Sequence, residues 1–81
     1  MSWRVEWSAP AERSLLNMPW KDATRVDAAV QRLASTGQGD LVRLPEDHAV
    51  TLRLRVKPYI ALLSLDRQQG ILHVINVYTF R

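Results

Sequence analysis

The start of the chain changes from a strand pattern to a helix pattern. Trp3, Val5 and Trp7 alternate with polar residues, which predicts a half-buried strand. Ser8 and Pro10 are typical of a helix start, because serine can cap a first turn and proline loses no backbone hydrogen bond there. We therefore expect a strand that leads directly into a helix.

Two helices are predicted next, separated by a proline. The first spans Pro10 to Met18, and Pro19 ends it because the residue before a proline is pushed out of the helical conformation. The second runs roughly from Trp20 to Ser35 and is closed by Gly37 and Gly39. Apolar residues repeat with a helical period in both helices: Ala11, Leu15 and Met18 in the first, and Ala23, Val26, Ala29, Val30 and Leu33 in the second.

Strand patterns follow in the second half of the chain. Leu41, Val42 and Leu44 form a short apolar run, and residues 45–47 read as a turn. Residues 50–57 alternate strictly between apolar and polar, which predicts a strand with one face of each kind.

Two further strands are apolar on both faces. They span Tyr59 to Leu65 and Ile71 to Phe80, and Asp66 to Gly70 forms the hairpin loop between them. Such strands are typical of central positions that are covered on both sides. The order β-α-α-(β)-β-β-β predicts one α+β domain over residues 1–81, with a small, mostly antiparallel sheet packed against an N-terminal helical hairpin.

Length and composition exclude several classes of protein. The chain has 81 residues, 47% of them hydrophobic, which suits one packed domain. It has no cysteine, which excludes a disulfide scaffold, a thiolate zinc site and cysteine catalysis. Two separated histidines, His48 and His73, do not form a common metal site, so we expect neither metal nor cofactor. No apolar run approaches the ~18 residues of a membrane span and no signal peptide is evident, so we expect a cytoplasmic protein without membrane contact.

The positive charge is concentrated in one half of the chain. Residues 1–48 hold six Lys or Arg against seven Asp or Glu, whereas residues 49–81 hold five against Asp66 alone. The formal net charge is +3. This asymmetry indicates either a face that meets polyanions or an acidic partner, or an ordinary basic surface.

The most informative feature is a row of three cations in the alternating strand. Arg53, Arg55 and Lys57 project from one face at steps of roughly 6.8 Å, close to the spacing of successive phosphates in a nucleic-acid strand. No acidic residue shares that face of the strand. The row predicts nucleic-acid binding. The alternative is a solvated face whose long side chains cover apolar neighbours.

The aromatic and histidine residues divide into expected packing residues and open candidates. We expect Tyr59 to fill the core with its hydroxyl at the rim, whereas Tyr78 could pack, stack on a base or transfer a proton. His73 lies inside an apolar strand and is expected to be structural. The tryptophans are expected to pack in the core or at an interface: Trp3, Trp7 and Trp20.

These elements together resemble the RelE/ParE superfamily of type II toxin–antitoxin toxins. The N-terminal strand and residues 8–11 (Ser-Ala-Pro-Ala), which open a helical hairpin, are similar to the family pattern. Residues 52–59 (LRLRVKPY) resemble its Y-R-L-R-V-x-x-Y-R signature. Asp66 before a hairpin and a last strand ending in Phe80-Arg81 extend the resemblance over the whole chain.

The resemblance implies one of two activities. RelE-like members cut mRNA in the ribosomal A site, ParE-like members inhibit DNA gyrase, and a cognate antitoxin holds either kind inactive. RNA cleavage would proceed by attack of a 2′-hydroxyl on the adjacent phosphate. For this reaction the resemblance implies catalytic roles for Arg53, Arg55, Arg81 and Tyr78, and RNA binding by Arg53, Arg55, Lys57 and Arg81.

Two departures from the family pattern keep the alternatives open. Ile60 stands where active nucleases often carry arginine, and the chain ends at Arg81, before the family's C-terminal tyrosine. Tyr78 is then the candidate substitute, and a one-residue shift would put Phe80 in the place of Arg81. We expect a ribosome-dependent mRNA endonuclease with an antitoxin, the ribosome and mRNA as partners. A ParE-like gyrase inhibitor without catalysis and a non-toxic relative remain the alternatives.

Overall fold

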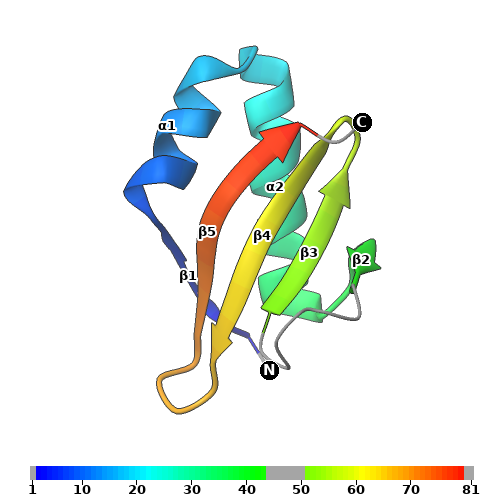
Figure 1. Cartoon of the computed structure of the whole chain (residues 1–81). Helices are drawn as coiled ribbons and strands as arrows, with labels where there is room; N and C mark the ends of the chain where they lie inside the picture. Colours follow the sequence, from blue (N-terminus) through cyan, green and yellow to red (C-terminus); the bar gives the residue numbers. More distant parts are fainter. Residues whose placement is uncertain (1, 44–50, 80–81) are drawn as a thin grey trace.

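A mixed β-sheet and two helices form the part of the chain that the structure, a computed structural model, describes: residues 2–43 and 51–79 (Figure 1). The elements in chain order are β1 (Arg4–Trp7), α1 (Ala9–Asn17), α2 (Trp20–Thr36), β2 (Leu41–Val42), β3 (Thr51–Val56), β4 (Tyr59–Asp66) and β5 (Ile71–Thr79). This order confirms the predicted α+β arrangement. The predicted turn at residues 45–47 and residues Leu44, Val50 and Phe80 lie outside the described residues.

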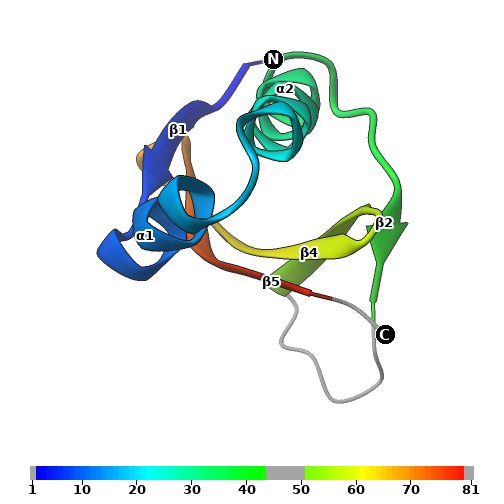
Figure 2. The ribbon, with the colours of Figure 1, turned by 90° about the horizontal axis from the view of Figure 1, so that it is seen from above.

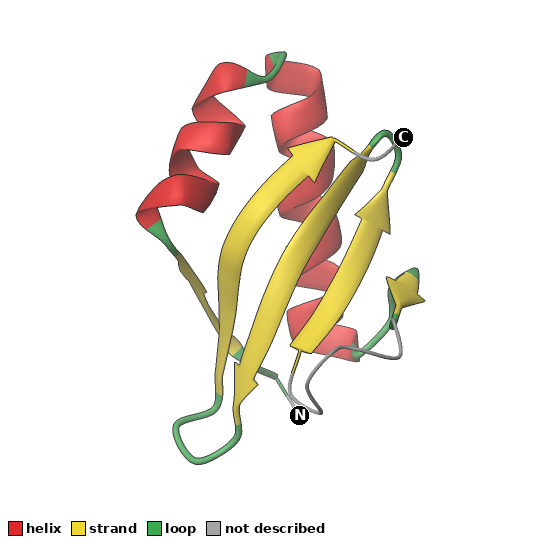
Figure 3. Ribbon diagram, in the orientation of Figure 1, coloured by secondary structure: helices red, strands yellow, loops and turns green. Residues whose placement is uncertain are grey.

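The sheet is antiparallel except at one edge. Its strand order is β1-β5-β4-β3-β2. The pairs β2–β3, β3–β4 and β4–β5 are antiparallel, whereas β1 runs parallel to β5 and pairs with residues 71–74. The helical hairpin returns the chain after β1, so the first and last described strands lie side by side (Figure 3).

Both helices lie on the same side of the sheet, which curves around α2 (Figure 2). We call the side that meets the helices the concave face and the other side the convex face. The core lies between the helices and the concave face, and its buried residues are Ala11, Val26, Val30, Leu33, Ala34, Leu54, Ala61, Leu63, Leu72, Val74 and Val77. The apolar stripes predicted for the two helices are therefore confirmed except at Ala23, since Leu15, Met18 and Ala29 pack against this core.

The described helices cover β4 and β5 on one side only, so the expectation of cover on both sides is not met by a second layer of described elements. Their alternate residues point to the convex face, where no described helix lies (Figure 2). The apolar pattern arose because two convex-face residues, Ile60 and Ile71, are buried at 4% and 3% exposure without belonging to the core cluster.

Helix ends follow the sequence signals. The Ser8 hydroxyl accepts a hydrogen bond from the Ala11 N–H at 3.2 Å and donates one to the Ile75 carbonyl, so the N-cap also ties α1 to β5. At the other end of the hairpin, Gly37 adopts the left-handed conformation (φ 76°) that closes α2. Trp3 and Trp7 pack against the core, but Trp20 is 74% exposed, so it is not a core residue.

Candidate nucleic-acid interface

Two of the three predicted cations share the convex face of β3. Arg53 and Arg55 lie on the strand, opposite in side-chain direction to the core residue Leu54. The prediction for Lys57 is wrong in position, because β3 ends at Val56 and Lys57 lies in the turn before β4. The Lys57 carbonyl accepts a hydrogen bond from Arg25 Nη2 at 2.7 Å, which anchors that turn to α2.

Arg53 is joined to Tyr78 across the sheet. Arg53 Nη1 donates to the Tyr78 hydroxyl oxygen at 2.6 Å. Arg53 lies on β3 and Tyr78 on β5, so this hydrogen bond crosses β4 at the level of Ile60 and Leu62. Arginine has no acceptor atom, so the tyrosine oxygen must accept and its own proton is left to donate elsewhere. The structure thus brings together two of the residues that the resemblance implied.

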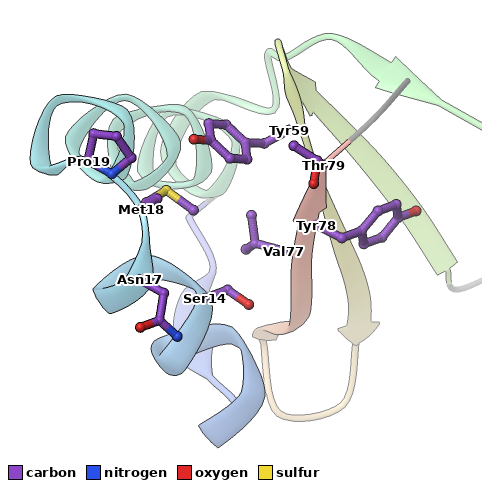
Figure 4. Close-up of a pocket in the computed structure, with 8 residues that line it drawn as sticks. All are labelled: Ser14, Asn17, Met18, Pro19, Tyr59, Val77, Tyr78 and Thr79. Carbon is purple, nitrogen blue, oxygen red and sulfur yellow. The ribbon is translucent and has the colours of Figure 1, made fainter.

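A β-bulge puts Tyr78 on the convex face. Leu63 pairs with Val74, but the next residue, Leu62, pairs with Asn76, so Ile75 is an extra residue in β5. Val74 is a core residue, and simple alternation would put Tyr78, four residues later, on the same concave face. The extra residue reverses the alternation of side chains between the two faces. After the bulge, Val77 is buried in the core and Tyr78 points away from the helices (Figure 4).

Arg55 has an acidic partner that sequence reasoning missed. Arg55 Nε donates to Asp40 Oδ2 at 2.8 Å, and the Arg55 backbone N–H donates to the Asp40 carbonyl at the same distance. No acidic residue lies on the convex face of β3 itself, as the sequence indicated. Asp40 comes from the loop after α2. Gly37 and Gly39 indicated where α2 ends, but nothing in the sequence indicated which strand the following loop would meet.

Ile60 occupies the middle of this group. In the strand register it lies between Arg55 on β3 and Tyr78 on β5. It is only 4% exposed. The position at which the resemblance implied an arginine in active nucleases therefore holds a buried apolar side chain in this chain.

A second polar row crosses the convex face farther along the strands. His73 pairs in register with Glu6 of β1 and with Ser64 of β4. The His73 Nδ1 lies 3.8 Å from Glu6 Oε1, and its side chain is 42% exposed. Glu6 also meets Arg4 Nη2 at 3.3 Å. Because His73 lies at the surface beside a carboxylate, it is not a core histidine.

A pocket of about 320 Å³ lies at the opposite side of β5, toward the helical hairpin (Figure 4). Tyr59 borders it, packs against the core and donates its hydroxyl proton to Asp22 Oδ2 at 2.7 Å, which confirms the predicted core position with the hydroxyl at the rim. This hydrogen bond, together with partial burial and the nearby charge of Asp22, raises the pKa of Tyr59 above its usual value. Tyr78 also lines the pocket from β5, whereas Arg53 and Arg55 do not, so the pocket and the predicted interface share only Tyr78 among these three residues.

Three residues named in the sequence predictions, Arg81, Phe80 and His48, lie outside the described residues 2–43 and 51–79. Within those ranges, no group of three His, Asp or Glu side chains is arranged to hold a metal ion. None of the helices in the same ranges is long and apolar enough to cross a membrane.

Comparison with known proteins identifies the architecture. The chain matches no family model and no curated protein sequence. Among solved structures, it is similar to the RelBE2 toxin–antitoxin complex of Mycobacterium tuberculosis (TM-score 0.82, 19% identity, covering 98% of this chain and 92% of that one). It is also similar to the RelE–RelB complex of Pyrococcus horikoshii (TM-score 0.80, 16% identity, coverage 98% and 96%).

A third similar structure is the RelB–RelE antitoxin–toxin complex of Methanococcus jannaschii, with a TM-score of 0.69, 12% identity and coverage of 90% of this chain and 87% of that one. At such low identities the likeness concerns the backbone architecture and not individual site residues. The resemblance drawn from the sequence is thereby confirmed at the level of the fold. The chain has the α+β fold of RelE toxins.

Proposed function

We propose that this chain is the toxin of a type II toxin–antitoxin pair and that it cuts mRNA on the ribosome with its convex face. The observation that carries the proposal is the group formed by Arg53, Arg55 and Tyr78 on the face that the helices leave uncovered. The fold shared with RelE complexes supports the same reading.

The chemistry of RNA cleavage gives each of these residues a role. When a 2′-hydroxyl attacks the neighbouring phosphate, negative charge grows on the phosphoryl oxygens, and fixed cations lower that barrier. Arg55 would hold the phosphate, and Arg53 would add positive charge while orienting Tyr78. Since the Tyr78 oxygen accepts from Arg53, its proton is available for the departing 5′-oxygen, as in general-acid catalysis, and the proton of the attacking 2′-hydroxyl would pass to water. Lys57, and Arg81 from the sequence alone, would add charge along the RNA path.

The proposed partners follow from the same surface. RNA would be presented by the ribosome in the cytoplasm, and a cognate antitoxin would hold the chain inactive. The three similar structures are complexes with antitoxins. A face that carries Arg53 and Arg55 suits an acidic or amphipathic antitoxin segment, and an exposed sheet edge could also accept it as an added strand.

The decisive experiment follows protein and DNA synthesis side by side by pulse labelling after induction. We expect protein synthesis to fall first, with cut mRNA on ribosomes. The double variant Arg53→Ala/Arg55→Ala should cut ribosome-bound mRNA at least about a hundredfold more slowly and should permit normal growth. A matched control, Arg13→Ala/Lys21→Ala, removes the same charge from the exposed surface of the helices and should remain toxic. Undiminished toxicity of the first double variant would refute the proposal.

The alternative function, gyrase inhibition without catalysis, is not favoured by the similar structures, which are RelBE2 and RelE–RelB complexes, and one observation alone weighs against catalysis. Ile60 puts a buried apolar side chain, rather than a cation, between Arg55 and Tyr78. If DNA synthesis falls first and mRNA stays intact, this second function replaces the first. If neither synthesis falls in the absence of an antitoxin, the chain is a non-toxic relative.

A further inference from the structure

The loop between α2 and β2 is built to approach β3 closely. It begins at Gly37, whose left-handed conformation ends α2. A side chain at Gly39 would place its Cβ only 2.8 Å from Leu54 Cδ1 and 3.5 Å from Leu33 Cδ1, so glycine allows the loop to pass directly over two core residues. The loop therefore delivers Asp40 to a defined place beside β3.

Two hydrogen bonds hold Asp40 against Arg55. One joins the Arg55 backbone N–H to the Asp40 carbonyl, and the strand pair β2–β3 begins with the next residue, Leu41. The other joins Arg55 Nε to Asp40 Oδ2 at 2.8 Å. Because the backbone contact fixes the position of Asp40, the carboxylate meets the guanidinium at a fixed point.

The contact uses only one of the donor groups of Arg55. A guanidinium carries one N–H at Nε and four more on Nη1 and Nη2. Within the described residues, no other hydrogen bond of the Arg55 side chain is formed, and the side chain is 35% exposed. Its terminal pair of nitrogens is thus left for an external ligand with two acceptor oxygens, such as a phosphodiester.

Arg53 differs from Arg55 in how it is held. Arg53 commits Nη1, at the end of its guanidinium, to Tyr78. Arg55 is held at Nε, the nitrogen nearest the chain. The two arginines are therefore unequal, and Arg55 is the better suited to grip a phosphate with both terminal nitrogens.

We propose that Asp40 is a positioning residue: it holds Arg55 at Nε so that Nη1 and Nη2 form a two-pronged clamp for one phosphate of an RNA substrate. This inference rests on the proposed function, and it gives a residue outside β3 a role in that function. An exposed ion pair contributes little to stability, so the main consequence of the contact is the orientation of Arg55.

The opposite hypothesis is that Asp40 merely competes with RNA for Arg55. Two substitutions separate the hypotheses. Asp40→Asn keeps an oxygen that can accept from Nε and removes the charge, whereas Asp40→Ala removes both. Asp27→Ala is the matched control, since Asp27 is an exposed residue of α2 whose carboxylate accepts a hydrogen bond from Gln31 within the same helix.

Cleavage of ribosome-bound mRNA by purified protein is the first measurement. We expect Asp40→Ala to lower kcat/KM about tenfold, and Asp40→Asn and Asp27→Ala to stay within about threefold of the wild type. The midpoint of urea unfolding should be nearly the same for all four proteins. Faster cleavage by either Asp40 variant, or an equal loss in both, would overturn the inference.

NMR of the Arg55 Nε–H group is the second measurement and requires no activity. In the wild type and in Asp40→Asn this proton should exchange slowly with water and the group should be rigid. In Asp40→Ala exchange should be faster, and mobility greater. If the wild type cuts no RNA, the proposed function fails. The same spectrum still tests whether Asp40 orients the Arg55 side chain. An unchanged Arg55 Nε–H signal in Asp40→Ala would show that Asp40 does not orient Arg55 and would overturn the inference.

Discussion

The two faces of the sheet use neighbouring residues for different purposes. On the concave face, Leu54, Ala61 and Leu63 are at most 1% exposed and pack beneath the helices. On the convex face, Arg53 and Arg55 are partly exposed and bind polar partners. The concave face follows from burial of apolar area, whereas the convex face depends on hydrogen bonds between strands and loops that are far apart in the sequence.

The largest expected difference between the faces is in their tolerance of a charge. Ala61→Arg would bury a guanidinium in the core without a partner and should lower the free energy of unfolding by more than about 4 kcal/mol. Ile60→Arg lies one residue away but on the convex face, so it should lose only the burial of isoleucine, roughly 1.5–3 kcal/mol. Urea unfolding of both variants measures the difference. Equal losses would contradict the assignment of the two residues to opposite faces.

A smaller difference is expected for two adjacent leucines of β4. Leu63→Ala removes a fully buried side chain from the core and should lower the free energy of unfolding by about 2–5 kcal/mol. Leu62→Ala removes a half-buried side chain from the convex face and should cost about 1 kcal/mol. Urea unfolding tests this pair: the midpoints of the two variants are compared, with the same dependence of the unfolding free energy on urea concentration assumed for both. A larger loss for Leu62 would mean that the convex face is packed as a second core.

The smallest expected effect concerns the two tyrosines, one for each face. The folded-state pKa of Tyr59 is raised, so the stability that its protonated hydroxyl contributes is complete below its usual pKa of about 10 and is lost as the pH rises above that value. Tyr59→Phe should therefore be less stable than the wild type near neutral pH, and the two proteins should converge at alkaline pH.

Tyr78→Phe serves as the comparison in the same experiment. Under the proposed function it should slow mRNA cleavage. Thermal unfolding at a series of pH values, with a cleavage assay in parallel, measures both effects. A constant difference between the wild type and Tyr59→Phe at every pH would contradict the role of the Tyr59–Asp22 bond.

Much of this architecture follows from local patterns. Period-two and helical repeats located the helices and strands, because each element must bury one apolar side. Ser8 and Gly37 mark helix ends for equally local reasons. The expectation of cover on both sides of β4 and β5 fits the structure only in part: the convex-face residues Ile60 and Ile71 are buried, but no described helix covers that face.

The order of elements, the concave core and the presence of two arginines on one face of β3 follow from the pattern of the amino-acid sequence. The contacts of those arginines depend on how distant parts of the chain pack together. A single extra residue at Ile75 reverses the parity of β5 and turns Tyr78 toward Arg53. A loop fifteen residues before Arg55 in the chain brings Asp40 to its Nε. Both contacts join segments far apart in sequence, and their register is set by how whole strands pair, which no local pattern records.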